Sequence, residues 1–282
     1  MRVCVSAIVA AFAVPLACMA QHPAPLDAPL PDPMQLLNRA LTNEKKMATE
    51  QERYECRVTD WSAETDKNGK IKKQETDVNE QFYVNGQQIE RMLQKDGKDL
   101  TPEQTRKEDQ RVMKETLKYS DKAKADKQAA KDNQNAVDVI SAMMLTNGHR
   151  ELVNGRNVLF YYIVPNPNFK PKNLTQHFAS VMQGKISLDE QTGEMIDLDV
   201  HSIKDIKIAG GVVASLHKGF WLHLHQTAQA DGVWLTDLAE GTGDARAALF
   251  FHPYFRFRQK TGDCHLFNAT AQQVGPATVV KK

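Results

Sequence analysis

The chain has 282 residues, of which 41% are hydrophobic and 25% charged, a balance typical of a folded globular protein and not of a disordered chain. Its 36 lysines and arginines nearly cancel its 35 aspartates and glutamates, which leaves a net charge of +1. No excess of charge favours a nucleic acid or an acidic membrane surface as partner, so we expect no nucleic-acid binding.

The first residues, 1–20, have the features of a secretory signal peptide. Arg2 supplies positive charge before an apolar stretch, 3–16, that is too short for a membrane anchor. Small residues before Gln21 predict cleavage at that point, and no later stretch is long and apolar enough for a transmembrane helix. The alternative is a lipid-modified Cys18, which ends a tripeptide similar to a bacterial lipobox. We therefore expect an exported, periplasmic protein, associated with the outer membrane if Cys18 is lipidated.

Two cysteines remain for an oxidising compartment. Cys4 and Cys18 belong to the signal peptide or its end, so that Cys56 and Cys264 are the mature pair. In an exported chain this pair is expected to form a disulfide. The alternative is two separately buried thiols; a catalytic thiol is not expected, because no Cys-x-x-Cys or activating motif is present.

A proline-rich tether is expected over 21–33, followed by a helix from about Pro33 to Gln51. Asp32 is its expected N-cap, and apolar residues recur at near-helical intervals. These residues are Met34, Leu37, Leu41 and Met47. A β-meander follows, since alternating strands are separated by turn sequences. The turns are Asn68-Gly69, Asn85-Gly86 and Asp96-Gly97.

Two helices are expected in the insert 101–147. The first, over about 102–131, mixes Lys and Arg with Asp and Glu, as in a solvated helix. The second, Asn135 to Leu145, has a wide apolar face and ends at Asn147-Gly148, so it must cover something apolar.

The chain then returns to strands. A hairpin turns at Asn154-Gly155, a short helix covers about 172–183, and strand patterns continue to Phe267 before a tail, 269–282, that is expected to be disordered. We predict an α+β, mainly antiparallel β fold: an unclosed β-barrel or strongly curved sheet with helices packed in its mouth.

Two groups of polar residues are candidates for sites of chemistry. His223 and His225 share a strand face, a spacing that metal sites use, but no third ligand is fixed and the simpler interpretation is a polar face. The acids of one hairpin suggest a glycosidase-like carboxylate pair, although they adjoin a tight turn. These acids are Asp189, Glu190, Glu194, Asp197 and Asp199. Since no hydrolase or nucleotide-binding motif is present, we expect no enzyme activity, catalytic residue, metal or cofactor.

The order of elements, with the segment from Gly184 to Leu198 (Gly-Lys-Ile-Ser-Leu-Asp-Glu-Gln-Thr-Gly-Glu-Met-Ile-Asp-Leu), resembles the outer-membrane lipoprotein-sorting superfamily of LolA, LolB and RseB. The stretch from Asn85 to Leu100 also looks like exported bacterial proteins of that type. The likeness covers roughly 51–267, and the charged helix departs from it. It implies a single LolA-like open β-barrel domain, 34–268, whose helices lid an apolar cavity for acyl chains.

On this basis we expect a periplasmic carrier or binding protein that holds an apolar ligand, a lipid or the acyl chains of a lipoprotein. An alternative is an envelope regulatory or structural protein that binds a protein partner, and a third is a hydrolase. The Met-rich second helix is the expected lid, because a flexible thioether adapts to exchangeable ligands. The expected cavity and lid residues are Phe82, Val84, Val137, Ile140, Met143, Met144, Phe255 and Phe257.

Overall fold

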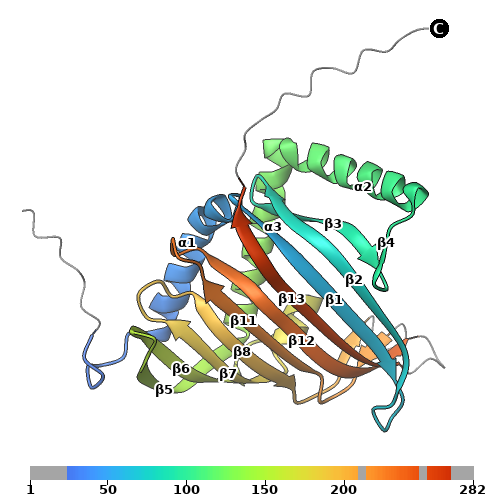
Figure 1. Cartoon of the computed structure of the whole chain (residues 1–282). Helices are drawn as coiled ribbons and strands as arrows, with labels where there is room; N and C mark the ends of the chain where they lie inside the picture. Colours follow the sequence, from blue (N-terminus) through green and yellow to red (C-terminus); the bar gives the residue numbers. More distant parts are fainter. Residues whose placement is uncertain (1–23, 209–213, 248–252, 268–282) are drawn as a thin grey trace, which may run out of the picture.

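The computed structural model describes residues 24–208, 214–247 and 253–267; the expected signal peptide with Cys18 and the expected tail 269–282 lie outside them. Within the described residues the chain forms helices and one large antiparallel sheet (Figure 1). The helices are α1 (Pro33–Gln51), α2 (Pro102–Ser120), α3 (Lys122–Ser141) and α4 (Leu174–Ala179). The strands are β1 (Tyr54–Thr65), β2 (Ile71–Val84), β3 (Gln87–Lys95), β4 (Lys98–Asp99), β5 (Met143–Val153), β6 (Arg156–Pro165), β7 (Met182–Asp189), β8 (Met195–Ser202), β9 (Ile206–Ile208), β10 (Ala214–Leu216), β11 (Trp221–Ala228), β12 (Trp234–Ala247) and β13 (Tyr254–Leu266).

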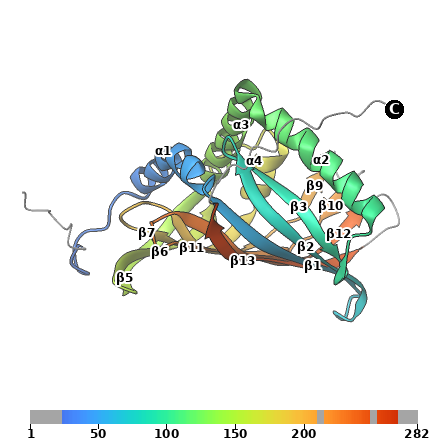
Figure 2. The same ribbon diagram turned by 45° about the horizontal axis from the view of Figure 1, so that its top comes forward.

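The sheet follows the order β4-β3-β2-β1-β13-β12-β11-β8-β7-β6-β5, and β10 pairs with β12 and β9. Its two ends, β4 and β5, are not paired with each other in the described part of the chain, so the sheet is not closed into a barrel. Figure 2 shows the helices on one side of this sheet, which we call the inner face. The predicted α+β, mainly antiparallel fold with an unclosed sheet is confirmed.

The sequence predicted the first elements well because local signals determine them. The Asp32 carboxylate accepts hydrogen bonds from the backbone N–H groups of Met34 and Gln35, at 2.8 and 3.1 Å, and so caps α1. Asn85 and Gly86, with φ of 48° and 75°, form the tight turn between β2 and β3.

The expected tether before α1 is, in its described part, packed on the domain. Arg150 of β5 donates hydrogen bonds to the backbone carbonyls of Pro25, Ala28 and Pro29. Asn157 of β6 binds the carbonyl of Ala24 in the same way, at 2.8 Å. We call residues 24–30 the strap; these side-chain donors hold it on the sheet although it forms no helix or strand.

The insert differs from the prediction in two ways. The charged helix breaks at Asp121, whose carboxylate caps α3 by accepting from the N–H groups of Ala123 and Lys124. The predicted helix Asn135 to Leu145 is wrong in its second half, because α3 ends at Ser141 and β5 begins at Met143. The predicted apolar face combined side chains from the end of α3 with side chains from the start of β5. Asn147, expected to stop a helix, lies within β5 with φ of 51°.

The inner face of the sheet carries the apolar core in three clusters, each of which includes side chains from several strands. The buried members are Leu36, Leu159, Tyr161 and Leu188 in the first, Tyr54, Cys56, Val233 and Leu235 in the second, and Ile163, Met182, Val200 and Phe220 in the third. Because Leu36 and Met47 of α1 join the first and second clusters, this one helix connects these two clusters across the inner face.

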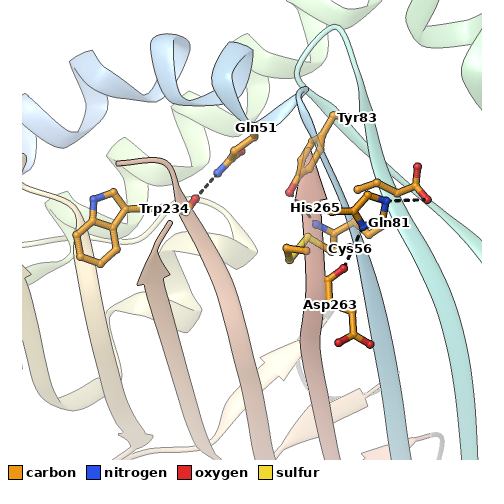
Figure 3. The surroundings of a disulfide bond; sticks show 9 residues. Gln51, Cys56, Gln81, Tyr83, Trp234, Asp263 and His265 are labelled. Carbon is orange, nitrogen blue, oxygen red and sulfur yellow. Dashed lines mark hydrogen bonds and ion pairs between the residues drawn. A yellow bond between two sulfur atoms is a disulfide. The ribbon is translucent and has the colours of Figure 1, made fainter. Parts of the chain in front are cut away.

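Cys56 of β1 and Cys264 of β13 form the predicted disulfide, whose surroundings are drawn in Figure 3. Nearby, the Tyr83 hydroxyl accepts a hydrogen bond of 2.7 Å from Gln81, and burial raises the pKa of Tyr83 to about 12. Structural disulfides persist in oxidising compartments, so the bond indicates a protein that functions outside the cytoplasm. No helix in the described ranges has the length and apolar character needed to cross a membrane.

Replacing Cys56 and Cys264 together by alanine is expected to lower the free energy of unfolding by up to about 5 kcal/mol, because the bond joins residues 208 positions apart and restricts the unfolded chain. Urea unfolding followed by circular dichroism measures the change, and the reduced wild type is the control that should match the variant. Recovery of the two cysteine peptides unlinked from a digest of unreduced protein would contradict the bond.

Candidate functional site

A cavity of about 940 Å³ lies between α1, the end of α3 and the inner face of the sheet. Most of its lining is aliphatic or methionine. From the helices it takes Pro33, Met34, Leu37, Ala40, Leu41, Met47, Ala48, Ala136, Val139 and Ile140, and from the strands Met143, Met144, Leu145, Ile163, Ile186, Leu188, Met195 and Leu198. A concave, mainly apolar space with few polar groups is the usual form of a small-molecule site in a protein.

The cavity runs along the whole of α1. Lining residues recur on this helix at intervals of three and four from Pro33 to Leu41 and again from Met47 to Gln51, and the two groups lie along one stripe facing the sheet. At a rise of ~1.5 Å per residue, the stripe is about 27 Å long. A ligand could therefore lie extended between the helix and the sheet.

Hydrogen bonds fix α1 to the sheet and its turns at two points along the helix. Arg39 donates to the carbonyls of Glu190 and Gln191, at 3.0 and 3.1 Å, in the turn between β7 and β8. Near the other end, Gln51 donates to the carbonyl of Trp234 at 2.9 Å, as drawn in Figure 3. The position of α1 above the cavity is thus set by these polar contacts together with the packing of Leu36 and Met47 in the apolar clusters.

The turn between β7 and β8 is shaped to receive α1. Gly193 has φ of 80°, and a Cβ atom there would lie 2.6 Å from the carbonyl oxygen of Leu36. Asn43 adds a hydrogen bond of 3.1 Å to the carbonyl of Thr192. Any larger residue at 193 would force the helix away from the turn.

The structure brings together three of the eight predicted site residues. Ile140, at the end of α3, and Met143 and Met144, at the start of β5, line the cavity. Val137 does not line it; its side chain is 41% exposed on another side of α3. The three lining residues meet although the continuous helix predicted for them does not exist, because the junction of α3 and β5 keeps them on one side.

The four predicted residues from β2 and β13 do not line this cavity. Phe255 and Phe257 pack in the third apolar cluster, and a Cβ atom at Gly243 or Gly241 would lie 2.7 or 2.6 Å from their rings. These rings therefore fill the space above two glycines and form solid core.

Phe82 and Val84 belong to the other half of the sheet. Phe82 pairs with Ile89 of β3, whereas its neighbour Gln81 pairs with Cys56, which shares a cluster with Met47 of α1. Since successive residues of a strand alternate in direction, Phe82 and Val84 point away from the face that α1 covers.

The residues of α1 are the part of the site that sequence reasoning missed. Their helical spacing was recognised, but the spacing is the same for a helix over a solid core and for one over a cavity. Ala40 and Ala48, small residues within an otherwise large apolar stripe, were the available signal.

The acidic hairpin considered for catalysis has a structural role. Asp189 is 1% exposed, forms an ion pair of 2.8 Å with Arg156, and accepts hydrogen bonds from the Thr192 backbone and hydroxyl. Glu190 binds Arg150 through two oxygens, at 2.6 and 2.8 Å. Both carboxylates are therefore committed to holding the turn and the strap, which argues against a glycosidase-like role.

Arg150 connects the strap, the hairpin and β5. Its side chain is 1% exposed, and hydrogen bonds to Glu190 raise its pKa, so it stays charged. Arg150→Met is expected to lower the free energy of unfolding by about 3 kcal/mol or more, because it leaves the Glu190 carboxylate without its ion-pair partner and the strap carbonyls without their donor. Chemical denaturation measures the loss. Lys107→Met, which removes a pair with Glu103 on the surface of α2, is the control and should cost less than about 0.5 kcal/mol.

The outer face of the sheet is polar and includes the two histidines. His223 of β11 contacts Asp197 at 2.8 Å and Glu240 at 3.3 Å, and His225 contacts Asp237 at 2.6 Å. In the described ranges no group of three or more potential ligands could hold a metal ion. The histidines are therefore part of a polar strand face.

Burial would lower the pKa of His223, but hydrogen bonds to Asp197 and Glu240 outweigh it and raise the pKa above the usual value. The imidazole of His223 therefore binds its proton more tightly in the folded state than in the unfolded state. Its contribution to stability is complete below the unfolded pKa of about 6.5 and is lost as the pH rises through the higher folded pKa. His223→Gln should therefore destabilise the protein more at pH 5.5 than at pH 9.

Unfolding free energies of both proteins at the two pH values measure this difference. His265→Gln, which changes a histidine with a 65% exposed side chain, is the control and should show a smaller pH dependence. Equal destabilisation by His223→Gln at both pH values would contradict the prediction.

Comparison with known proteins adds little to this description. No protein-family model and no curated protein matches the sequence. The crystal structure of a DUF1329 family protein from Desulfovibrio piger ATCC 29098 aligns with 86% of this chain and 96% of its own, at 10% identity and a TM-score of 0.28. So weak a likeness supports no inference about this chain, and membership of the lipoprotein-sorting superfamily stays a prediction.

Proposed function

We propose that this protein is a periplasmic carrier or binding protein that holds an apolar ligand, a lipid or the acyl chains of a lipoprotein, in the cavity beneath α1. The observation that carries the proposal is the cavity itself: about 940 Å³ of space lined mainly by aliphatic and methionine side chains. Transfer of hydrocarbon from water into such a space is favourable by ~0.8 kcal/mol per CH₂ group.

Two features fit exchange of the ligand with the surroundings. Met34 and Met144 line the cavity and are nevertheless 50% and 42% exposed, so apolar surface is continuous from the cavity to the solvent. Methionine side chains also adapt their shape at low cost to different hydrocarbon ligands. A filled core would favour a protein that binds only a protein partner; an apolar cavity of this size favours the carrier.

Ile140→Asp is expected to weaken binding of a neutral apolar dye such as Nile red at least about tenfold, because it places a carboxylate in the apolar lining. Val137→Asp, one turn away on an exposed side of α3, is the matched control and should bind the dye like the wild type. Fluorescence titration measures both. A wild-type protein that takes up no dye, or equal binding by Ile140→Asp, would contradict the proposal.

A second substitution distinguishes a cavity from a solid core if Ile140→Asp does not fold. Ala136→Phe should occupy part of the cavity, so that it lowers dye binding while the free energy of unfolding is kept or raised. In a solid core the same change would overpack the interior and cost about 1 to 3 kcal/mol. Native mass spectrometry of protein from an envelope fraction would then identify the bound lipid.

A further inference from the structure

The strap presents apolar side chains to the solvent. The buried residues Arg150 and Asn157 hold it through its backbone carbonyls, so its contact with the sheet is made by polar main-chain groups. Its largest apolar side chains stay exposed, Leu26 at 58% and Leu30 at 37%. A segment fixed in this way keeps leucines in contact with water, which folding by itself does not favour.

A further exposed apolar side chain lies beside the strap on β5. Leu30 lies against this strand, because a Cβ atom at Gly148 would be 2.9 Å from its Cδ1 atom. Leu152 of β5, which is 55% exposed, pairs with Asn157, whose side chain binds the strap. The exposed leucines of the strap and of β5 are therefore neighbours.

The mouth of the cavity lies at the same end of the molecule. Met34, at the start of α1 shortly after the strap, and Met144, at the start of β5, line the cavity and are exposed. Figures 1 and 2 show the strap beside β5, the strand at one end of the sheet. We call the exposed apolar residues of this region the apolar patch: Leu26, Leu30, Met34, Met144 and Leu152.

We propose, on the basis of the proposed function, that the apolar patch docks on a lipid bilayer and turns the mouth of the cavity towards it. A hydrocarbon chain that crosses water on its way to the cavity exposes its whole apolar surface, whereas exchange at the membrane surface avoids this exposure. A second copy of this chain seated on the patch would cover the mouth. A bilayer supplies the ligand at the place where the cavity opens.

Flotation with neutral phosphatidylcholine vesicles measures the docking. The protein is produced from Gln21, without the expected signal peptide and Cys18, so that no covalent lipid contributes. The wild type should float with the vesicles at about 0.1 M and at about 1 M NaCl, because apolar insertion depends little on salt. Flotation that requires anionic lipid and is lost at high salt would overturn the proposal.

Leu26→Asp combined with Leu152→Asp is the patch variant. It should lower the partition coefficient for vesicles at least about tenfold, because two carboxylates would have to enter the interface in place of two leucines. Both side chains are exposed, so the fold should be retained.

Met113→Asp combined with Leu117→Asp is the matched control. These side chains are 58% and 66% exposed on α2, which binds β3 through Glu108 near the other end of the sheet. The control should float like the wild type. Equal flotation of the patch variant and the control, or a wild type that does not float, would overturn the proposal.

Uptake of Nile red without vesicles separates the docking from the proposed function. Leu26 and Leu152 do not line the cavity, so the patch variant should take up the dye with wild-type affinity, which also shows that it is folded. A wild type that takes up the dye but does not float overturns the docking alone. A wild type that takes up no dye overturns the proposed function.

Sedimentation equilibrium tests the other occupant. A wild type that does not float, but forms dimers that the patch variant cannot form, would identify the patch as an interface between two copies. That result would overturn docking on a membrane.

A substitution that keeps the patch apolar gives a second measurement. Leu26→Trp should float at least as well as the wild type, since indole rings favour the membrane interface, and its added fluorescence should shift to shorter wavelength when vesicles are present. Leu117→Trp is the control and should show no such shift. Emission of Leu26→Trp that stays unchanged while the protein floats would show that another surface binds the membrane, and would overturn the role of the patch.

Discussion

The pairing of β1 with β13 is the constraint on which the rest of the structure depends. It joins the N-terminal meander to the C-terminal strands along eleven paired positions, from Tyr54 with Leu266 to Thr65 with Tyr254. Because α1 directly precedes β1, this pairing also determines where α1 starts its course over the inner face. The disulfide between Cys56 and Cys264 lies within the same pair of strands and covalently fixes their association.

A helix held near its middle and at its C-terminal end can leave space beneath it. Apolar burial is the main stabilisation of most helices on a sheet, and it normally draws the two surfaces together until no cavity remains. Here Arg39, Asn43 and Gln51 bind backbone carbonyls of the sheet, and Gly193 allows contact with Leu36 at one point. These contacts, with the packing of Leu36 and Met47 against the sheet, set the distance of α1 from the sheet.

The elements set by local signals could be predicted from the sequence. The N-cap at Asp32, the turn at Asn85-Gly86 and the alternation of strands gave the first helix, the meander and the antiparallel fold class with nearly correct bounds. The prediction of the junction between α3 and β5 was wrong, because Met143 and Met144 have apolar neighbours at both helical and strand spacing. Only pairing with Val164 and Pro165 of β6, a long-range interaction, makes them a strand.

The candidate site was predicted in part for the same reason. Ile140, Met143 and Met144 were identified from their side chains, whereas the contribution of α1 depends on how a distant turn receives that helix. The aromatic residues were misplaced, because a large ring next to a cavity and a large ring over Gly241 or Gly243 give the same sequence pattern on their own strand. The glycines that distinguish the two cases lie on β12, and only the register of β12 with β13 places them beneath Phe257 and Phe255.

Small side chains, more than large ones, make this cavity. Ala40 and Ala48 of α1 and Ala136 of α3 line it, and leucine at any of these positions would fill space that the backbone positions leave open. An unfilled apolar space forgoes dispersion contacts and burial, so its presence costs stability that a bound hydrocarbon would restore. A ligand that binds only the folded state stabilises it in proportion to RT ln(1 + [L]/Kd). The same alanines that lower the stability of the empty protein therefore create the affinity that we propose for its ligand.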